Sequence, residues 1–90
     1  MTYEWDPAKA KANARKHHVS FEEAASIFLD HAALSFLDPD HSEVEDRFIT
    51  IGRSARQRVL FVSHAEREDR IRIISARRAT RREGLDEATQ

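Results

Sequence analysis

The stretch that decides the fold covers residues 47–76 and reads RFITIGRSARQRVLFVSHAEREDRIRIISA. It contains three β-type segments separated by polar turns of hairpin length. Residues 47–53 alternate between the two faces of a strand, and residues 59–62 are continuously apolar, which is typical of a central strand covered on both sides. Residues 70–76 alternate again. The pattern predicts an antiparallel meander of three strands.

Two helices are predicted before these strands. Asp6-Pro7 supplies an N-cap followed by a proline at the first helical position, and an alanine- and lysine-rich helix follows over residues 8–16. Ser20 and Glu23 form a capping box, in which the hydroxyl caps an amide and the carboxylate is expected to reach back. The second helix has its apolar side chains in one amphipathic stripe.

Short elements at both ends complete the predicted order. Residues 3–5 and 33–37 read as strands, and Thr80 with Glu83 forms a second capping box at the start of a C-terminal helix. The tail over residues 84–90 is expected to fray, because a glycine weakens the helix. The predicted fold class is α+β: a small antiparallel sheet with helices packed on one face, in the order β-α-α-β-β-β-β-α.

The composition indicates one globular domain over residues 1–90. Hydrophobic residues make up 40% and charged residues 34% of the chain, and the net charge is −1, which is too apolar and too balanced for a disordered chain. No apolar run approaches the roughly 20 residues that cross a bilayer, and no secretory signal is visible, so a cytoplasmic location is expected. The chain has no cysteine, which excludes a disulfide scaffold and the usual zinc–thiolate site.

Charge is distributed unevenly along the chain. Residues 1–46 carry ten acidic and four basic residues, whereas residues 47–82 carry eleven arginines, three acidic residues and no lysine. The arginine side chain offers a planar fork that grips a phosphate or a carboxylate at two points. Two interpretations stay open: a solvated sheet face with salt bridges to the acidic half, or contact with a polyanion or an acidic protein partner.

Three basic clusters are candidates for chemistry. Lys16-His17 ends the first predicted helix, where it fits either a surface histidine that caps the helix dipole or a proton-transferring histidine beside a phosphate-binding lysine. Arg53 ends a strand, with Arg56 and Arg58 just beyond it. The largest cluster straddles a strand-to-helix junction, where exposed amides and the helix dipole favour anions. This cluster contains Arg77, Arg78, Arg81 and Arg82.

Other site chemistries are not indicated. The chain has two glycines and therefore no glycine-rich phosphate loop. It has no Cys/His spacing typical of a metal site, since the adjacent His17 and His18 point in different directions. No signature places a serine on a nucleophile elbow. No metal and no cofactor are expected, and His64 is expected to be a satisfied, half-buried histidine.

Four motifs follow one another in a recognisable order. They are Glu4-Trp5-Asp6-Pro7-x-Lys9, Lys16-His17-x-Val19-Ser20-Phe21-Glu22-Glu23-Ala24, Arg47-Phe48-x-x-Ile51-Gly52 and Arg72-Ile73-Ile74-Ser75-Ala76-Arg77-Arg78-Ala79-Thr80-Arg81-Arg82-Glu83. Their order and spacing over residues 3–83 resemble the BrnT family, the toxin half of a type II toxin–antitoxin pair. The chain departs from this family at His18, where members often carry glycine, and at Gly84-Leu85-Asp86-Glu87, which replaces an arginine-rich stretch with an aromatic.

The resemblance implies a RelE-like ribonuclease fold that cleaves RNA and arrests growth. It also implies a cognate BrnA-type antitoxin, a ribbon-helix-helix protein that neutralises the toxin and represses the shared operon. Operator DNA would then be reached only through the antitoxin. The positions that carry over by motif are Lys16, His17, Arg53, Arg77, Arg78 and Arg81.

Cleavage of RNA without a metal needs a base for the 2′-hydroxyl, an acid for the leaving oxygen and positive charge near the phosphorane. Arginines suit the last task, and His17 is the hypothetical acid or base. The predicted catalytic residues are Lys16, His17, Arg53, Arg77 and Arg78, and the predicted RNA-binding residues are Arg56, Arg58, Arg81 and Arg82. Two alternatives stay open: a non-catalytic module that docks an acidic partner or nucleic acid, and a degenerate toxin that serves as antitoxin co-repressor.

Overall fold

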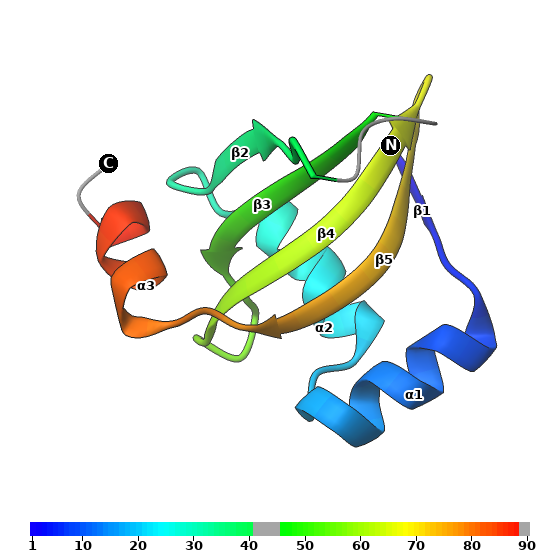
Figure 1. Ribbon diagram of the computed structural model, residues 1–90, viewed down its shortest axis with the longest axis horizontal. Coiled ribbons are helices and arrows are strands. Elements are labelled where there is room, and N and C mark those ends of the chain that lie inside the picture. Colours follow the sequence, from blue (N-terminus) through cyan, green and yellow to red (C-terminus); the bar gives the residue numbers. More distant parts are fainter. Residues whose placement is uncertain (41–45, 89–90) are drawn as a thin grey trace.

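The computed structural model describes residues 1–40 and 46–88, which form one five-stranded sheet flanked by helices (Figure 1). The strand order across the sheet is β1-β5-β4-β3-β2. The α+β class and the predicted order of elements are confirmed. No helix within these described ranges is long and apolar enough to cross a membrane. The elements are β1 (Thr2–Glu4), α1 (Pro7–His17), α2 (Phe21–Ser26), the 3-10 turn η1 (Ile27–Leu29), β2 (Leu34–Leu37), β3 (Arg47–Arg53), β4 (Val59–Arg67), β5 (Arg70–Arg78) and α3 (Arg81–Ala88).

Strands β3, β4 and β5 form the predicted antiparallel meander. Phe61 in the central strand lies opposite Ile51 of β3 and opposite Arg77 of β5. The two connections are tight turns, and each holds one residue in the left-handed backbone region, with φ of 66° at Gln57 and 53° at Glu68. The polar spacers that separate the β-type segments in the sequence are therefore hairpin turns.

A β-bulge changes the alternation of side chains along β5. His64 of β4 lies opposite Ile73, whereas the preceding residue of β4 lies opposite Ser75, so Ile74 is an extra residue in the strand. Beyond this bulge Ala76, and not Ser75, enters the core, where it is 1% exposed. The bulge therefore decides which side chains at the end of β5 face each side of the sheet.

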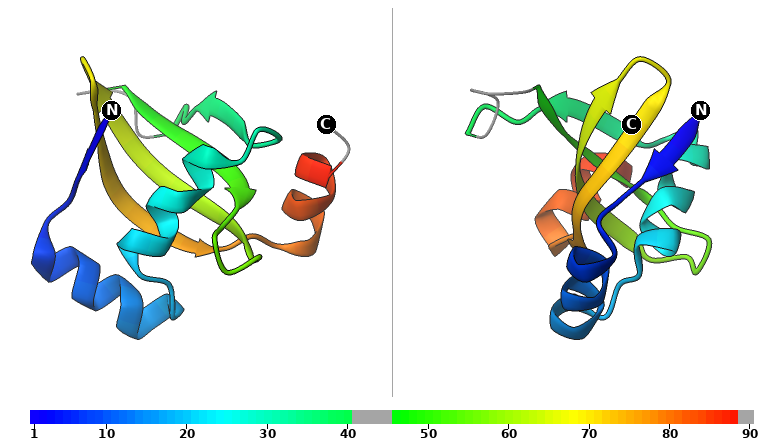
Figure 2. Two further views of the ribbon diagram at one scale, coloured as in Figure 1. Left: turned by 180° about the vertical axis from the view of Figure 1, so that it is seen from behind. Right: turned by 90° about the vertical axis from the view of Figure 1, so that its right-hand side faces the viewer.

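Different helices cover the two faces of the sheet. We call the face covered by α2 the inner face and the opposite one the outer face; Leu60 and Val62 point inward, and Ile51 and Phe61 point outward. The predicted packing on one face holds for α2, whereas α1 lies beside the edge of β5 and α3 lies over the outer face against β3 (Figure 2). The apolar side chains of β3 on the outer face need this cover. The core cluster comprises Val19, Phe21, Ala24, Ile27, Leu60, Val62, Ile71, Ile73 and Ala76.

The first strand makes the sheet mixed, where a wholly antiparallel one was expected. β1 pairs with β5 in parallel, and Glu4 lies beside Arg72. The chain leaves β1 directly into α1, which lies against the later part of β5. On its way to α1, the chain in β1 therefore runs from the start of β5 toward its end. β1 is for this reason parallel to β5.

Side-chain caps fix the helix starts as predicted, with one exception. Asp6 accepts a hydrogen bond from the amide of Ala8 at 2.8 Å, and Ser20 accepts one from the amide of Glu23 at 3.0 Å. Thr80 and Glu83 cap each other reciprocally at the start of α3. The exception is Glu23, whose carboxylate was expected to reach back to its own helix end; it bonds other elements, as described below.

Helix α1 ends on a residue in the left-handed backbone region. His18 has φ 59° and ψ 35°, and its amide donates to the carbonyl of Ala14. This is the position that favours glycine, because any side chain is strained there. The departure from the family pattern at His18 therefore falls on a strained backbone position. At the other end of the chain, α3 passes through Gly84 and continues to Ala88, and residues 89–90 lie outside the described residues.

Candidate functional site

A groove runs between the exposed side of α1 and the middle of β5. It is open to solvent and places Lys16 and His17 of the helix opposite Ser75 of the strand. Lys16 is exposed and His17 is half-buried, so both reach solvent. The full lining is Lys9, Ala12, Asn13, Lys16, His17, Ile74 and Ser75. A lysine and a histidine thus share one concave surface, which is the arrangement that proton transfer beside a phosphate needs.

Asn13 fixes this groove by tying α1 to β5. Its side-chain nitrogen donates to the carbonyls of Ala76 at 2.8 Å and Val19 at 3.1 Å, and its oxygen accepts from the amide of Ala76 at 3.1 Å. Sequence reasoning missed this residue. The available signal was a poor helix former, Asn, in the middle of an alanine-rich helix, where it requires a tertiary hydrogen-bond partner.

Arg77 lies on the outer face at the junction with α3 and is already bound by the protein. Its two terminal nitrogens donate to the two carboxylate oxygens of Glu83, each at 3.0 Å. Its guanidinium carbon lies 3.9 Å from the centre of the Phe61 ring, in a cation–π contact. Hydrogen bonds from Arg77 and the amide of Thr80 lower the pKa of the Glu83 carboxyl, so Glu83 is a carboxylate at neutral pH.

Arg78 has the opposite orientation to Arg77. It pairs with Leu60 across the strands, so it lies on the inner-face side of the sheet end, and it is exposed. Among the described residues it donates no side-chain hydrogen bond and forms no ion pair. The C-terminus of α1 reaches this end of the sheet, since the carbonyl of His18 accepts a hydrogen bond from Arg58 at the start of β4. Arg78 therefore lies at the same end of the molecule as Lys16 and His17.

The arginines of the β3–β4 turn differ in their environment. Arg58 is held by Glu23, which accepts from its Nε at 2.9 Å and from a terminal nitrogen. Hydrogen bonding to Arg58 lowers the pKa of the Glu23 carboxyl, although burial opposes this shift. Arg56 is 70% exposed and lies 3.8 Å from the same carboxylate. Arg53 donates from its side chain to the carbonyl of Gln57 at 3.3 Å.

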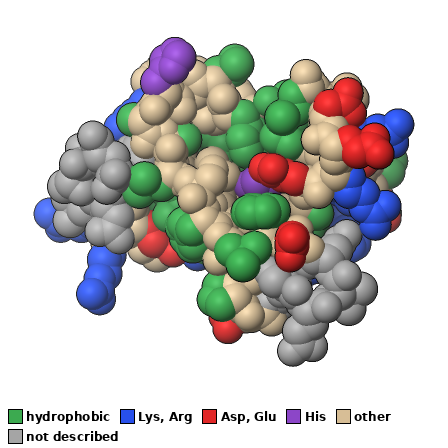
Figure 3. Space-filling model, turned by 90° about the horizontal axis from the view of Figure 1, so that it is seen from above, with side chains coloured by type: hydrophobic (Ala, Val, Ile, Leu, Met, Phe, Trp, Pro, Cys, Tyr) green, Lys and Arg blue, Asp and Glu red, His purple; other side chains and the backbone are tan. Residues whose placement is uncertain are grey.

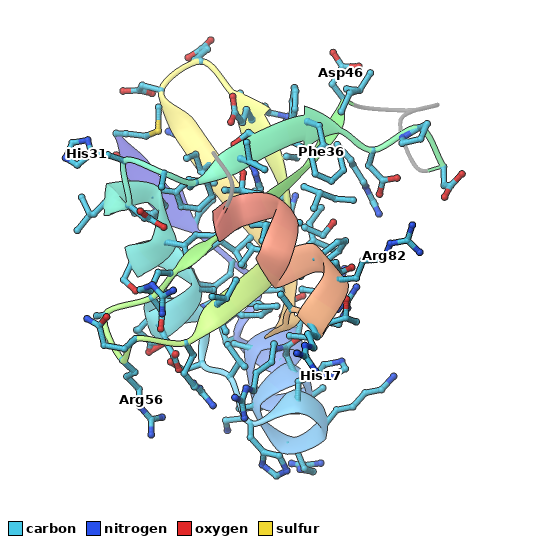
Figure 4. All side chains as sticks on the ribbon, turned by 90° about the vertical axis from the view of Figure 1, so that its left-hand side faces the viewer. His17, His31, Phe36, Asp46, Arg56 and Arg82 are labelled. Carbon is cyan, nitrogen blue, oxygen red and sulfur yellow. The ribbon has the colours of Figure 1, made fainter. Side chains whose placement is uncertain are left out.

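The predicted site residues therefore form several clusters. The hollow at the β3–β4 turn includes Arg53 and shares no lining residue with the groove that holds Lys16 and His17. Figure 4 shows Arg56 at the turn and Arg82 on α3 on opposite sides of the molecule, with His17 on α1 below α3. Arg81 and Arg82 begin α3 and are exposed.

His64 is more deeply buried than expected and lies outside this groove. It is 0% exposed, and its Nε2 is 2.7 Å from the hydroxyl of Thr50. Among the described residues Nδ1 has no hydrogen-bond partner, and it lies 3.8 Å from a carboxylate oxygen of Glu66. The Phe28 and Phe48 rings flank it, with centroids 4.9 and 5.9 Å away. Burial lowers the pKa of His64 to about 4. It is therefore a neutral core residue near neutral pH.

Two exposed apolar side chains lie on the edge strand β2. Phe36 and Leu37 are 46% and 50% exposed. Leu29 of η1 is 79% exposed. Figure 3 looks onto the molecule from above and shows hydrophobic side chains grouped near its middle. Isolated exposed apolar residues are common, but a group on an edge strand is typical of a surface that meets another protein.

The fold and the basic groove place this chain among small α+β proteins with a positively charged cleft at one end of a sheet. Residues 5–83 match the family described as "Ribonuclease toxin, BrnT, of type II toxin-antitoxin system". The chain belongs to this BrnT family, as its motifs indicated, and the family implies an antitoxin partner and an RNA substrate.

Comparison with solved structures supports the same fold. The crystal structure of the ribonuclease toxin BrnT of Brucella abortus superposes with a TM-score of 0.67 and is 21% identical, covering 90% of this chain and 100% of that one. A search of curated proteins found no significant match. Within residues 1–40 and 46–88, no group of three or more His, Cys, Asp or Glu residues could hold a metal ion.

Proposed function

We propose that this protein is a metal-independent endoribonuclease of the cytoplasm that arrests growth and is neutralised by a cognate BrnA-type ribbon-helix-helix antitoxin. The observation that carries the proposal is the groove in which Lys16 and His17 face Ser75, with the exposed Arg78 at the same end of the molecule. Lys16 and His17 supply a positive charge and an imidazole on one accessible surface.

Each residue has a role in the proposed reaction. His17 exchanges a proton with the 2′-hydroxyl or the leaving oxygen, because an imidazole can both accept and donate a proton and this one lines the groove. Lys16 and Arg78 stabilise the charge that develops on the phosphorane. Arg53, Arg56, Arg81 and Arg82 bind the RNA backbone on either side. Arg77 orients the start of α3 through Glu83, and Arg58 supports the β3–β4 turn through Glu23.

The apolar group on β2 supports the partner half of the proposal. Phe36 and Leu37 lie on an edge strand whose far side no other described strand covers. An antitoxin segment that adds to this edge would bury these side chains. The proposed antitoxin would therefore contact the toxin on the β2 side as well as at its basic surface.

Expression in a bacterial host tests the toxin function. Induction of the protein alone should reduce colony counts and degrade cellular RNA, and co-expression of the proposed antitoxin should restore growth and intact RNA. His17→Ala should remove toxicity, whereas Lys11→Ala, an exposed residue of the same helix outside the groove, should leave it intact. Normal growth with intact RNA on induction of the unaltered protein would contradict the proposal.

The metal requirement is tested separately with purified protein and RNA. Cleavage should continue in EDTA, because the proposed chemistry uses only side chains of the chain. If EDTA abolishes cleavage and added Mg²⁺ restores it, the metal-independent, arginine-centred mechanism is wrong. The proposal of ribonuclease activity would not be affected by this result.

A further inference from the structure

We propose that RNA bound at the groove extends along the outer face of β5 and that its phosphates are held by Arg70 and Arg72 in a second hollow at the β4–β5 turn. This inference rests on the proposed function, since it assigns a further binding site for the same RNA. The second hollow is a depression that is partly open to solvent. Its lining is Glu4, Arg67, Glu68, Arg70 and Arg72.

The β5 register places the two hollows on one face of the sheet. Arg72 lies opposite Ala65, and beyond the bulge Ser75 lies opposite Ser63. These pairs point outward, because the inner face at the same level carries the buried Ile73 and His64. Figure 1 looks onto the outer face, with α2 passing behind the strands and α3 at one end only. The path from one hollow to the other therefore stays on a face that α2 does not cover.

The distance between the hollows suits one short RNA segment. Arg72 and Ser75 are three residues apart on an extended strand, which corresponds to about 10 Å. A single RNA strand of a few nucleotides spans such a distance, and basic grooves that track a backbone typically hold about 4–16 nucleotides. The groove at α1 and the hollow at the turn can thus bind neighbouring phosphates of one strand.

Arg70 and Arg72 are available to bind phosphate. Both are exposed, and among residues 1–40 and 46–88 neither makes a side-chain hydrogen bond or an ion pair. Between them and the groove the outer face carries two small side chains, the half-buried Ser63 and the buried Ala65, and therefore no large side chain of β4 at these positions. Arginine rather than lysine at both positions suits bidentate contact with phosphate oxygens.

An acidic residue in the same hollow provides a second test, in which the expected change in RNA affinity has the opposite sign. Glu4 lies beside Arg72 in the β1–β5 pair, lines the hollow and is exposed. Its carboxylate repels a phosphate backbone laid along β5. If the RNA passes here, replacing Glu4 with a neutral residue should strengthen RNA binding. A variant that folds poorly would lose affinity, so a gain in affinity is not explained by misfolding.

The experiment measures binding of the full-length protein to a single-stranded oligouridylate of about ten nucleotides, by fluorescence anisotropy at several salt concentrations. Methylated 2′-hydroxyls prevent cleavage, so binding is read independently of activity. R70A/R72A should lower the salt dependence of log K by about 1.4, because each phosphate contact on a single strand contributes about 0.7. E4Q should raise the affinity. R15A, an exposed arginine of α1 outside both hollows, should leave the slope unchanged.

The outcomes separate this inference from the proposed function. Unchanged affinity and slope in R70A/R72A, with the unaltered protein binding RNA normally, would overturn the inference alone. An unaltered protein that binds no RNA would overturn the proposed function as well. A third outcome is that R70A/R72A retains its RNA affinity and loses antitoxin binding. This result would assign the hollow to the protein partner and would also overturn the inference. The melting temperature of each variant is measured alongside. A lower RNA affinity of R70A/R72A supports the inference only if the RNA affinity of E4Q is higher than that of the unaltered protein.

Discussion

The side-chain amide of Asn13 on α1 binds both backbone groups of Ala76 on β5, in the way that a neighbouring strand would. Its oxygen accepts from the Ala76 amide at 3.1 Å, and its nitrogen donates to the Ala76 carbonyl at 2.8 Å. The described part of β1 pairs only with residues 70–72, so the later edge of β5 has no strand beside it. Asn13 satisfies that edge and thereby sets the position of the groove on α1.

Replacing Asn13 with alanine should destabilise the protein by about 2–4 kcal/mol. The substitution leaves the buried amide and carbonyl of Ala76 and the carbonyl of Val19 without partners. The free energy of unfolding is measured by urea denaturation. Lys11→Ala on the exposed side of α1 is the control and should change stability by less than about 0.5 kcal/mol. An equal denaturation midpoint for N13A and the unaltered protein would show that the clamp contributes nothing.

The Glu23–Arg58 pair should be a structural requirement, unlike the neighbouring Arg56. The Glu23 and Arg58 side chains are only 5% and 18% exposed, and Glu23 also accepts from the hydroxyl of Ser54 at 2.7 Å. Arg58→Ala leaves a largely buried carboxylate without its main partner, so it should cost roughly 3 kcal/mol. Arg56→Ala should cost less than about 0.5 kcal/mol, because that side chain is mostly in water. Chemical denaturation compares the two, and equal losses would refute the distinction.

His64 should make the protein less stable as the pH falls below neutrality. Burial lowers the pKa of His64 from 6.5 to about 4, so the unfolded chain binds a proton that the folded protein excludes. The stability that neutral His64 contributes is present above about pH 6.5 and is lost as the pH falls toward 4, by up to about 3 kcal/mol. The free energy of unfolding is measured by urea denaturation across this range.

Two comparisons isolate the histidine in that experiment. The pKa values of Glu23 and Glu83 are lowered from 4.5, so their contribution is present above 4.5 and is lost only at more acidic pH. His64→Gln removes the titrating group and should flatten the curve between pH 6.5 and 4.5, whereas the exposed His31→Gln should leave it unchanged. A pH dependence that persists in H64Q would locate the titrating group elsewhere.

Local sequence signals predicted the elements well because their causes are local. The caps at Asp6, Ser20 and Thr80 are each satisfied within three residues, so residue spacing is enough to identify them. Two features could not be predicted in this way. The bulge at Ile74 changes the phase of an otherwise regular alternation, and the carboxylate of Glu23 is used by Arg58, which is 35 residues away.

The same limit applies to the candidate site. The sequence places Arg77 and Arg78 together among the catalytic candidates, and strand alternation sends them to opposite faces without saying which one is free to meet a phosphate. The structure gives Arg77 a carboxylate partner and leaves Arg78 exposed. The exposure and ion pairing of these two arginines depend on how α3 packs against β3 and on the contact with Phe61. No residue pattern in the sequence specifies this packing. Alternation over residues 70–76 places Arg70 and Arg72 on one strand face but does not reveal their hollow, because the hollow is formed jointly with β1 and the β4–β5 turn.

Substituting glycine for His18 should stabilise the protein. His18 ends α1 with φ 59°, a conformation that strains any residue with a side chain. Relief of this strain exceeds the added entropy of a glycine in the unfolded chain, so the gain should be about 0.5–1 kcal/mol. Arg15→Gly, inside the same helix, is the control and should lower stability by about 1 kcal/mol. Thermal melting compares the two variants, and a lower melting temperature for H18G would contradict the explanation.

The two adjacent arginines at the end of β5 should have separable roles. Arg78 is exposed and has no partner among the described residues, so Arg78→Ala should leave melting behaviour native. If Arg78 stabilises the phosphorane, its loss should cost roughly 2–4 kcal/mol of barrier, or about 30- to 1,000-fold in cleavage rate. Arg77→Ala should instead lower stability by about 1 kcal/mol, because it removes the ion pair with Glu83 and the contact with Phe61.

Glu83→Gln separates the two effects further. It weakens the grip on Arg77 while leaving that guanidinium in place, so it should reproduce much of the stability loss of Arg77→Ala and retain cleavage. Cleavage rates with purified RNA and melting temperatures are measured for all three variants. If Arg78→Ala cleaves RNA at the normal rate while Arg77→Ala is inactive with native melting behaviour, the assigned roles are reversed, and Glu83 would then have to release Arg77 when RNA binds.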